Sequence, residues 1–264
     1  DTAGESLEAA LATATELGYA EKSDPSADIE GFDAAQKTAI LASLAFHTTV
    51  PLDKVHREGI TTVTLQQVEE ARKAGYVVKL LSISERLTDA ETGEEGVSAR
   101  VYPALVPRDH PLAAVHGAKN AVFVEAEAAG DLMFYGAGAG GRETASAVLG
   151  DLVSAARRHV IGGPGVAEST HAKLPILPIS RITTRYQITL SVIDKPGVLA
   201  AVATMFSDHG VSVEAVEQSV RADWQGDGSA TATLVIGTHK ASESDLSATV
   251  AALEASDVVS SVTS

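Results

Sequence analysis

The sequence predicts an α/β (α+β) protein in which a mixed sheet covered by helices precedes a ferredoxin-like βαββαβ unit. Strand-like and helical hydrophobic patterns follow each other along the 264 residues, as they do where helices pack on a sheet. A Gly- and Pro-rich stretch from Gly162 to Pro178 separates a longer first region from a shorter second one. Aromatic residues make up only 4% of the chain, so Ala, Val, Leu and Ile must build the core.

The first region opens with a helical pattern over 4–17, which Gly18 ends, and continues into an acidic loop over 20–31. A second helix is predicted over 33–47, because its apolar residues recur at helical spacing. Strand patterns then cover 76–84, 97–105, 120–126 and 132–135, and a third helix covers 143–159. A Gly- and acid-rich turn joins the first two strands, so we expect a hairpin there.

The second region has a compact order of elements. A strand over 186–193 leads into the turn Asp194-Lys195-Pro196-Gly197, where Pro196 suits the first turn of a helix. A helix over 198–209, strands over 211–218 and 230–238, a helix over 242–253 and a strand over 258–262 follow. This order is a split βαβ. We therefore divide the chain into a first domain over 1–161, a linker over 162–182 and a second domain over 183–264.

Charge and composition exclude several classes of protein. The net charge of −15 argues against partners such as nucleic acid or an anionic membrane, which favour basic surfaces. There is no cysteine, which excludes disulfides and thiol chemistry. No apolar run is long enough to cross a bilayer and no signal-peptide pattern is present, so we expect a cytoplasmic protein. The chain begins at Asp1 without Met, and we expect residues to precede it.

A charged cluster lies around the start of the second predicted helix. Asp33 and Lys37 are four residues apart, so they share one helix face. The loop before them adds the carboxylates of Glu21, Asp24, Asp28 and Glu30. A lysine among carboxylates can hold a proton for transfer, and the carboxylates can bind a substrate ammonium group. From spacing alone, the alternative is a solvated ion pair worth about 0.3–0.5 kcal/mol.

A glycine-rich loop precedes the third predicted helix. Gly136, Gly138 and Gly141 match the spacing of a dinucleotide fingerprint, and Gly140 lies between the last two. No second strand with an acidic residue about twenty positions on follows, so a complete Rossmann domain is excluded here. The loop is either a close approach to a cofactor or a tight turn beside a helix.

Two other features carry weaker signals. Glu125 and Glu127 point to the same face if they lie on a strand. They form either a second carboxylate site or a solvated strand end. The eight histidines show no ligand spacing such as HExxH, so we expect no transition-metal site.

The stretch Gly18-Tyr19-Ala20-Glu21 with Asp24-Pro25 through Lys37 resembles the substrate-loop signature of homoserine dehydrogenases, of the actinobacterial type with a C-terminal ACT domain. The resemblance implies that Lys37 is the proton donor and acceptor at the reacting carbon and that Asp33 supports it. It also implies that Asp28 and Glu21 bind substrate. Relative to the signature, Lys22-Ser23 adds a residue between Glu21 and Asp24.

The segment Asp194-Lys195-Pro196-Gly197-Val198-Leu199-Ala200 resembles the ACT domain, a module that pairs side by side and binds amino acids at the shared edge. The resemblance implies that Asp194 and Gly197 belong to an effector site, with L-threonine as a feedback effector. The alternative is a dimerisation module that has lost its ligand, because a fold alone does not establish one.

Together the resemblances imply interconversion of L-homoserine and L-aspartate 4-semialdehyde with NADP or NAD, in threonine and methionine biosynthesis. In that family the loop of Gly136, Gly138 and Gly140 approaches the nicotinamide end of the cofactor. We expect a homodimer or homotetramer, with the Rossmann portion upstream of Asp1, so this chain alone should be inactive. The rivals are a catalytically inactive amino-acid-binding regulatory protein on the same scaffold and a dehydrogenase acting on a related amino acid.

Overall fold

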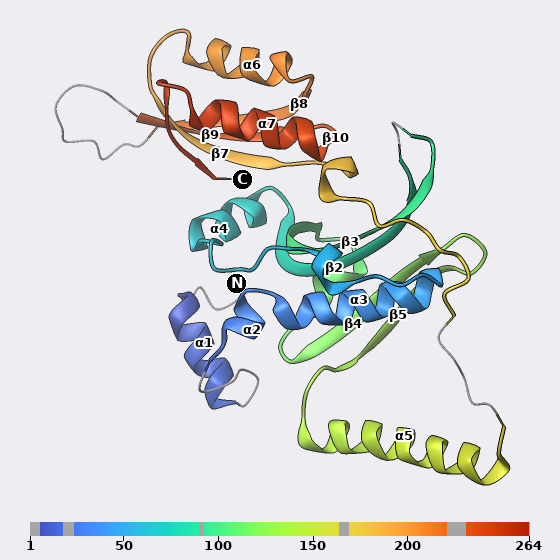
Figure 1. The fold of residues 1–264 in the computed structure, drawn as a ribbon. Coiled ribbons are helices and arrows are strands. Elements are labelled where there is room, and N and C mark those ends of the chain that lie inside the picture. The colour runs from blue at the N-terminus through green and yellow to red at the C-terminus, as the bar shows by residue number, and fades with distance from the viewer. Residues whose placement is uncertain (1–5, 18–23, 90–91, 164–168, 221–230, 264) are drawn as a thin grey trace. The chain divides into compact units, whose positions relative to one another are not determined.

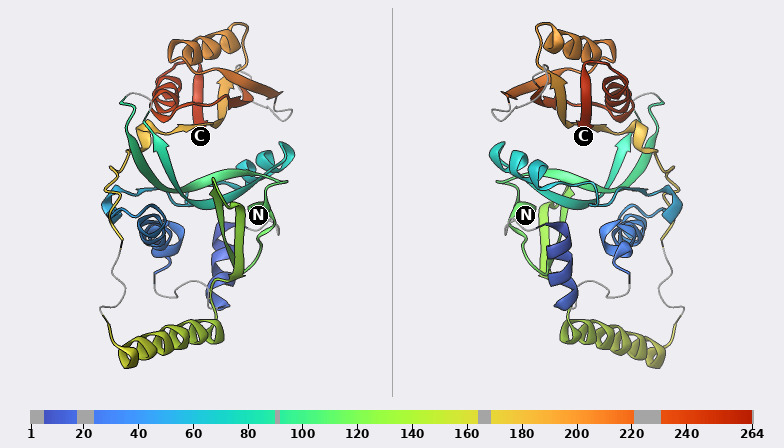
Figure 2. Two further views of the ribbon diagram at one scale, coloured as in Figure 1. Left: turned by 90° about the vertical axis from the view of Figure 1, so that its right-hand side faces the viewer. Right: turned by 90° about the vertical axis from the view of Figure 1, so that its left-hand side faces the viewer.

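The computed structural model describes residues 6–17, 24–89, 92–163, 169–220 and 231–263 (Figure 1). The chain forms two compact units. Unit 1 comprises Asp1–Arg86 and Ala99–Leu174, and unit 2 comprises Leu87–Ser98 and Pro175–Ser264. Helices and sheets occur in both units, which confirms the α/β (α+β) class predicted from the hydrophobic patterns (Figure 2).

The helices described in unit 1 are α1 (Leu7–Glu16), α2 (Ser26–Ile29), α3 (Phe32–Phe46), α4 (Leu65–Lys73) and α5 (Gly141–Ile161), with short 3₁₀ turns η1 (Leu52–Lys54) and η2 (Pro111–Ala114). Of these helices, α1 and α4 begin with side-chain caps. The side chain of Ser6 caps α1 by accepting a hydrogen bond from the Ala9 amide at 3.2 Å. The hydrophobic pattern does not predict α4, but Thr64 and Gln67 form a capping box at its start.

The strands of unit 1 fall into two hydrogen-bonded sets. They are β1 (His56–Arg57), β2 (Tyr76–Thr88), β3 (Glu95–Pro107), β4 (Lys119–Ala126) and β5 (Gly130–Ala137). A three-stranded sheet has the order β1-β3-β2, and β1 runs parallel to β3, so the sheet is mixed as predicted. The Asp89 amide donates to the Glu94 carbonyl at 2.8 Å, which closes the predicted β2–β3 hairpin. The pair β4–β5 forms a separate antiparallel hairpin.

Small aliphatic side chains make up the core of unit 1, in keeping with the low aromatic content. Ala35 and Ala42 on α3, Ala71 on α4 and Val101 on β3 are all at most 2% exposed. Small residues allow helix and sheet backbones to approach closely, so a change of even one methyl group is felt in such a core.

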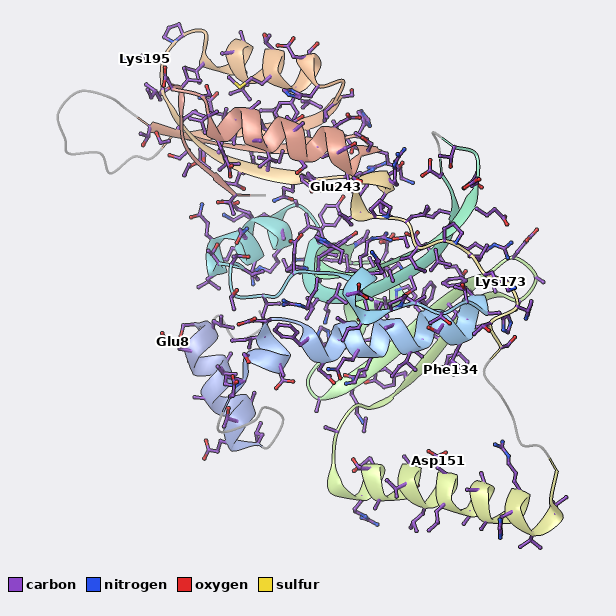
Figure 3. All side chains as sticks on the ribbon, in the orientation of Figure 1. Glu8, Phe134, Asp151, Lys173, Lys195 and Glu243 are labelled. Atoms are coloured by element: carbon purple, nitrogen blue, oxygen red, sulfur yellow. The ribbon has the colours of Figure 1, made fainter. Side chains whose placement is uncertain are left out.

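Large apolar side chains remain exposed on the β4–β5 hairpin and on α5. Val122 lies opposite Phe134, and Val124 lies opposite Leu132, so these four residues share one face of the hairpin. Their exposed fractions run from 37% for Val124 to 64% for Phe134, which Figure 3 labels on β5. No residue of α5 is buried, so this helix does not contribute to the core of unit 1.

Unit 2 contains the predicted ferredoxin-like unit. Its elements are β7 (Gln187–Ile193), α6 (Val198–Asp208), β8 (Val213–Val220), β9 (Thr231–Thr238), α7 (Glu243–Glu254) and β11 (Val259–Thr263). The strands pair antiparallel in the order β11-β7-β9-β8. Alternate residues of β7 and β9 are buried, which places one sheet face in the core. Ile188, Leu190, Phe206, Leu234 and Leu246 pack at the centre of that core.

Short elements precede the ferredoxin-like unit. Ile176 forms a parallel bridge with Val97, η3 (Ile179–Arg181) follows, and β6 (Thr183–Thr184) pairs with β10 (Ala241–Ser242). The division at 1–161, 162–182 and 183–264 stays a prediction. In the described part of the chain, no helix combines the length and hydropathy needed to cross a membrane.

Candidate functional site

The first candidate site is the junction between α2 and α3. Gly31 separates the two helices with a φ of 77°, a left-handed conformation that glycine adopts without strain. Its amide donates to the Asp28 carbonyl at 3.2 Å, and its carbonyl accepts from the Ala35 amide at 2.9 Å. This turn therefore ends α2 and begins α3, and it places Asp28 just before the junction and Asp33 just after it.

Among the described site residues predicted from the sequence, Lys37 and Asp33 are the pair joined by a direct hydrogen bond. The Lys37 Nζ donates to Asp33 Oδ2 at 2.5 Å, and the two side chains are 60% and 47% exposed. An exposed ion pair at this spacing adds only about 0.3–0.5 kcal/mol to stability. The lysine head is thus oriented by a carboxylate while remaining open to a small molecule, as a proton carrier must be.

The other carboxylates of the cluster divide into different roles. The exposed Asp28 side chain lies on α2, which contacts α3. Asp24 instead accepts a hydrogen bond from the Ser26 amide at 2.9 Å, and its hydrogen bonds with Ser26 lower the pKa of its carboxyl group. Asp24 therefore satisfies the amide of the first residue of α2. Glu21 lies outside the described residues.

Residues of β1 and of the loop after it contact this junction. The sequence patterns did not indicate these contacts. The guanidinium of Arg57 donates to the Glu30 carbonyl and lies over the Phe32 ring, with its Cζ 3.6 Å from the ring centroid. The Ile60 amide donates to the Ile29 carbonyl at 2.8 Å. The turn is thus bound from both sides by one short segment.

In the glycine-rich loop, the local structure leaves little room for a side chain at two of the glycines. A Cβ on Gly138 would overlap the side-chain amide of Asn120 on β4, with the Asn120 Oδ1 only 2.7 Å away. Gly140 has a φ of 135° and begins α5, and a Cβ there would lie 3.0 Å from the Glu143 Cδ. At Gly136 a Cβ would meet nothing within 4 Å. The tight-turn interpretation accounts for Gly138 and Gly140, whereas Gly136 leaves an open surface.

Glu125 lies opposite Asp131 at the closed end of the β4–β5 hairpin, and both side chains are exposed, as is Glu127. Two like charges face each other there in solvent, which is the arrangement of a solvated strand end. Among the described residues, no group of three or more His, Cys, Asp or Glu side chains is placed to hold a metal ion.

The second candidate site is a small pocket in unit 2, at the turn between β7 and α6. Its volume is about 180 Å³, smaller than the roughly 300 Å³ of a pocket for a drug-sized ligand. The pocket is lined by Val192, Ile193, Asp194, Lys195, Pro196, Gly197, Val198, Leu199, Gln218 and Leu234. Its size suits a small metabolite rather than a dinucleotide.

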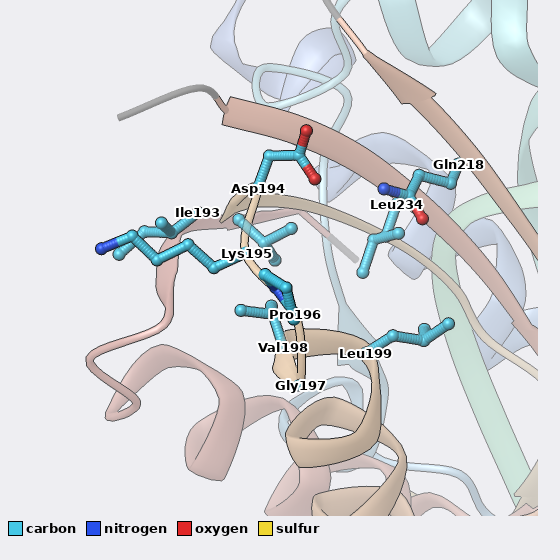
Figure 4. A pocket seen from close by; sticks show the side chains of 10 residues that line it. Ile193, Asp194, Lys195, Pro196, Gly197, Val198, Leu199, Gln218 and Leu234 are labelled. Carbon is cyan, nitrogen blue, oxygen red and sulfur yellow. The ribbon is translucent and has the colours of Figure 1, made fainter. Parts of the chain in front are cut away.

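Both predicted effector residues, Asp194 and Gly197, line this pocket (Figure 4). Gly197 precedes the first turn of α6 with a φ of 94°, and no side chain caps that helix. The Val198 amide donates to the Lys195 carbonyl at 3.3 Å, and the next amides of this first turn, which no side chain caps, can receive a carboxylate. Gln218 on β8 brings a side-chain amide to the same pocket. Sequence spacing gave no signal for Gln218, because only the pairing of β8 with β9 places it there.

Comparison with family models matches both parts of the chain. The model described as homoserine dehydrogenase matches residues 1–153, which contain the α2–α3 junction. The model described as ACT domain matches residues 186–257, which contain the unit 2 pocket.

Known proteins and solved structures agree with these matches. The chain is 56% identical over 264 residues to a homoserine dehydrogenase of Mycobacterium tuberculosis and 52% identical to that of Corynebacterium glutamicum, covering 59% and 57% of their lengths. A crystal structure of a homoserine dehydrogenase from Thiobacillus denitrificans aligns with a TM-score of 0.87 at 36% identity, over 98% of this chain and 58% of that one. This chain thus spans less than two thirds of these relatives.

Proposed function

The chain belongs to the homoserine dehydrogenase family and carries an ACT domain, and from that premise we propose that the protein containing it interconverts L-homoserine and L-aspartate 4-semialdehyde with NADP or NAD. The observation that carries the proposal is the oriented but open Lys37–Asp33 pair on α3, inside the matched region. An exposed pair at this spacing can also be an ordinary solvated pair, so the support comes from its position within the matched region.

The reaction removes a hydride from the carbon that bears the hydroxyl group and a proton from the hydroxyl oxygen. NADP or NAD, held beside the loop of Gly136, Gly138 and Gly140, would supply the hydride acceptor. The Lys37 amine takes the hydroxyl proton as the carbonyl forms and returns it in the reverse direction. Asp33 holds the Lys37 head in place through their hydrogen bond. Asp28 and Glu21 hold the amino-acid substrate in this scheme, Glu21 through its amino group, so that the hydroxyl is presented to Lys37.

The loop of Gly136, Gly138 and Gly140 is the proposed approach for the nicotinamide end of the cofactor. The open space above Gly136 and the exposure of the loop fit a flat ring lying against bare backbone. The Glu143 carboxylate lies against Gly140, and its negative charge opposes a phosphate there. The loop therefore fits the ring better than the phosphates.

We propose that unit 2 senses L-threonine as a feedback effector. The ACT match and the pocket at the β7–α6 turn support this role. The free amides at the start of α6 suit the effector carboxylate, and Asp194 suits its ammonium group. The alternative, a dimerisation module that has lost its ligand, predicts that the complete protein has no threonine affinity.

We also propose that the complete protein is a homodimer or homotetramer. The apolar face of the β4–β5 hairpin, formed by Val122, Val124, Leu132 and Phe134, supports self-association. Exposed apolar patches of this kind on ordered strands commonly mark contacts between proteins.

The proposed activity is tested by following cofactor reduction by the complete protein with L-homoserine. Turnover that depends on homoserine supports the dehydrogenase, and its absence in a folded, cofactor-binding protein overturns it. The rival, an inactive amino-acid-binding protein, predicts homoserine binding without turnover. Calorimetry with wild type and Asp28→Ala decides whether that binding uses the α2–α3 junction, since loss of affinity in the variant assigns it there.

A further inference from the structure

We propose that Arg57 is a positioning residue that holds the α2–α3 turn and thereby sets the relative placement of Asp28, Asp33 and Lys37. This inference rests on the proposed function, because it assigns Arg57 a part in the same site. Arg57 itself is not proposed to touch the substrate.

Two contacts of one guanidinium bracket the turn. Arg57 Nη1 donates to the Glu30 carbonyl, and the plane of the group covers the Phe32 ring at 3.6 Å. Glu30 and Phe32 flank Gly31, so the two contacts fall on either side of the residue where the chain changes direction. A partly buried cation over an aromatic ring adds attraction to the hydrogen bond.

Arg57 itself lies on a strand of the mixed sheet. Arg57 lies opposite Val101 in the parallel pairing of β1 with β3, and Val101 is fully buried. The Glu58 amide donates to the Val101 carbonyl at 2.7 Å, which continues the ladder beyond β1. The guanidinium is thus held by a regular element, and sites supported from strands are held more exactly than sites on free loops.

The segment after Arg57 packs closely against the backbone of the same turn. A Cβ on Gly59 would lie 2.5 Å from the Glu30 Cα, so the two backbones are in direct contact. A Cβ on Gly31 would lie 3.6 Å from the Arg57 Cγ, so the turn also rests on the arginine stem. Because both backbones are closely packed here, the turn cannot shift unless this contact opens.

The turn that Arg57 contacts is next to Asp28, Asp33 and Lys37 in the sequence. Asp28 is two residues before Glu30, and Asp33 directly follows Phe32. Lys37 is one helical turn further along α3 and is bound to Asp33. A displacement of about 1 Å at a reacting centre can reduce a rate by about 100-fold. Loosening the turn would therefore separate the substrate-binding carboxylate from the lysine.

The experiment compares Arg57→Met, Arg57→Lys and wild type in the complete protein. Arg57→Met keeps the apolar stem and removes both contacts, and we expect kcat/KM for homoserine to fall roughly 10- to 100-fold. The KM for the cofactor should stay within twofold. Arg57→Lys keeps the charge but loses the planar fork, so it should fall between Arg57→Met and wild type. Arg72→Met, at an exposed arginine of α4, is the matched control and should match wild type.

Thermal unfolding and amide hydrogen exchange over residues 24–37 distinguish positioning from a general loss of stability. Positioning predicts faster exchange in that segment together with the kinetic defect. A folded Arg57→Met protein with wild-type homoserine constants overturns the proposal. If Arg57→Met does not fold, Arg57→Lys and Phe32→Leu take its place, and wild-type constants for both overturn it. Wild-type protein without homoserine turnover instead refutes the proposed function, so the two failures are distinguishable.

Discussion

Lys37 and Asp33 lie one helical turn apart on α3 and are joined by a 2.5 Å hydrogen bond that remains open to solvent. The geometry of the pair is well defined, although it gives the fold little free energy. A substitution at either position should therefore reduce turnover while leaving the free energy of unfolding nearly unchanged, because it removes no packing contact.

Replacing Lys37 with Met should therefore abolish turnover without unfolding the protein. General acid–base catalysis by a positioned group contributes roughly 100- to 10,000-fold, and we expect kcat for homoserine oxidation to fall by at least that range. The free energy of unfolding should change by no more than about 0.5 kcal/mol, the value of the exposed pair. Steady-state kinetics and denaturant titration of the complete protein measure the two effects.

Lys54→Met provides the matched control, because Lys54 is an exposed lysine in η1 of the same unit. It should leave both turnover and stability unchanged. Lys37→Met with turnover close to wild type would contradict the role assigned to Lys37, whatever happens to stability.

Hydrophobic periodicity predicted most elements to within a few residues. The helix expected over 33–47 is α3 (Phe32–Phe46), and the strand expected over 97–105 is β3 (Glu95–Pro107). The order of elements along unit 2 was also predicted, and its strands β7 and β9 have alternate residues buried. The helix α4 is nine residues long and mostly polar, so Leu65, Val68 and Ala71 form only a short apolar stripe, and the clearest sequence signal is the Thr64 and Gln67 cap.

The support of the site was not predictable from spacing. Arg57 contacts Phe32 across 25 positions of sequence only because β1 pairs with β3. Gln218 reaches the unit 2 pocket only through the register of β8 on β9. Sequence patterns report local periodicity, whereas these contacts depend on which distant strands become neighbours. The roles assigned to Asp28, Glu21 and the glycine loop stay predictions.

Gly197→Ala should destabilise unit 2 through its backbone alone. A Cβ at this position would meet no atom within 4 Å, so the cost comes from the φ of 94° and should be about 1–2 kcal/mol. That loss corresponds to a fall in Tm of several degrees for a domain of this size. Threonine affinity should fall as well, because the turn carries the first amides of α6.

Two controls separate these effects. Gly237→Ala on β9 places a Cβ 3.9 Å from that of Ala215, in ordinary contact, and should leave Tm unchanged or slightly raised. Gln218→Leu should reduce threonine affinity without lowering Tm, since Gln218 is exposed on an edge strand. Calorimetric binding by Gln218→Leu equal to that of wild type would remove this residue from the effector site.

The contribution of Glu58 to stability should depend on pH in the acid range. Its hydrogen bond with His56, at 2.7 Å, lowers the pKa of Glu58 below its ordinary value of 4.5, against the opposing effect of partial burial. A carboxyl group whose pKa is lowered by folding stabilises the folded state above its unfolded pKa, and this contribution is lost as the pH falls through the folded pKa.

Glu58→Gln should therefore be less stable than wild type at neutral pH, and the difference should shrink as the pH falls below about 4.5. Urea unfolding of both proteins at a series of pH values measures it. The control variant is Glu94→Gln, at an exposed glutamate of the β2–β3 turn. It tests whether removing any exposed glutamate carboxyl group gives the same pH dependence of stability. A stability difference that stays constant down to pH 3 would show that the His56 contact is not responsible.

Phe134→Glu should weaken self-association of the complete protein. Phe134 is 64% exposed and lies opposite Val122 on the apolar hairpin face, so a buried interface there would have to desolvate the new carboxylate. Tyr135→Glu places the same charge on the other face of β5 and should leave the assembly intact. Light scattering during size-exclusion chromatography gives the mass of each variant. Equal masses for Phe134→Glu and wild type would place the interface elsewhere, because a charged side chain at the centre of an apolar contact costs several kcal/mol unless it is paired.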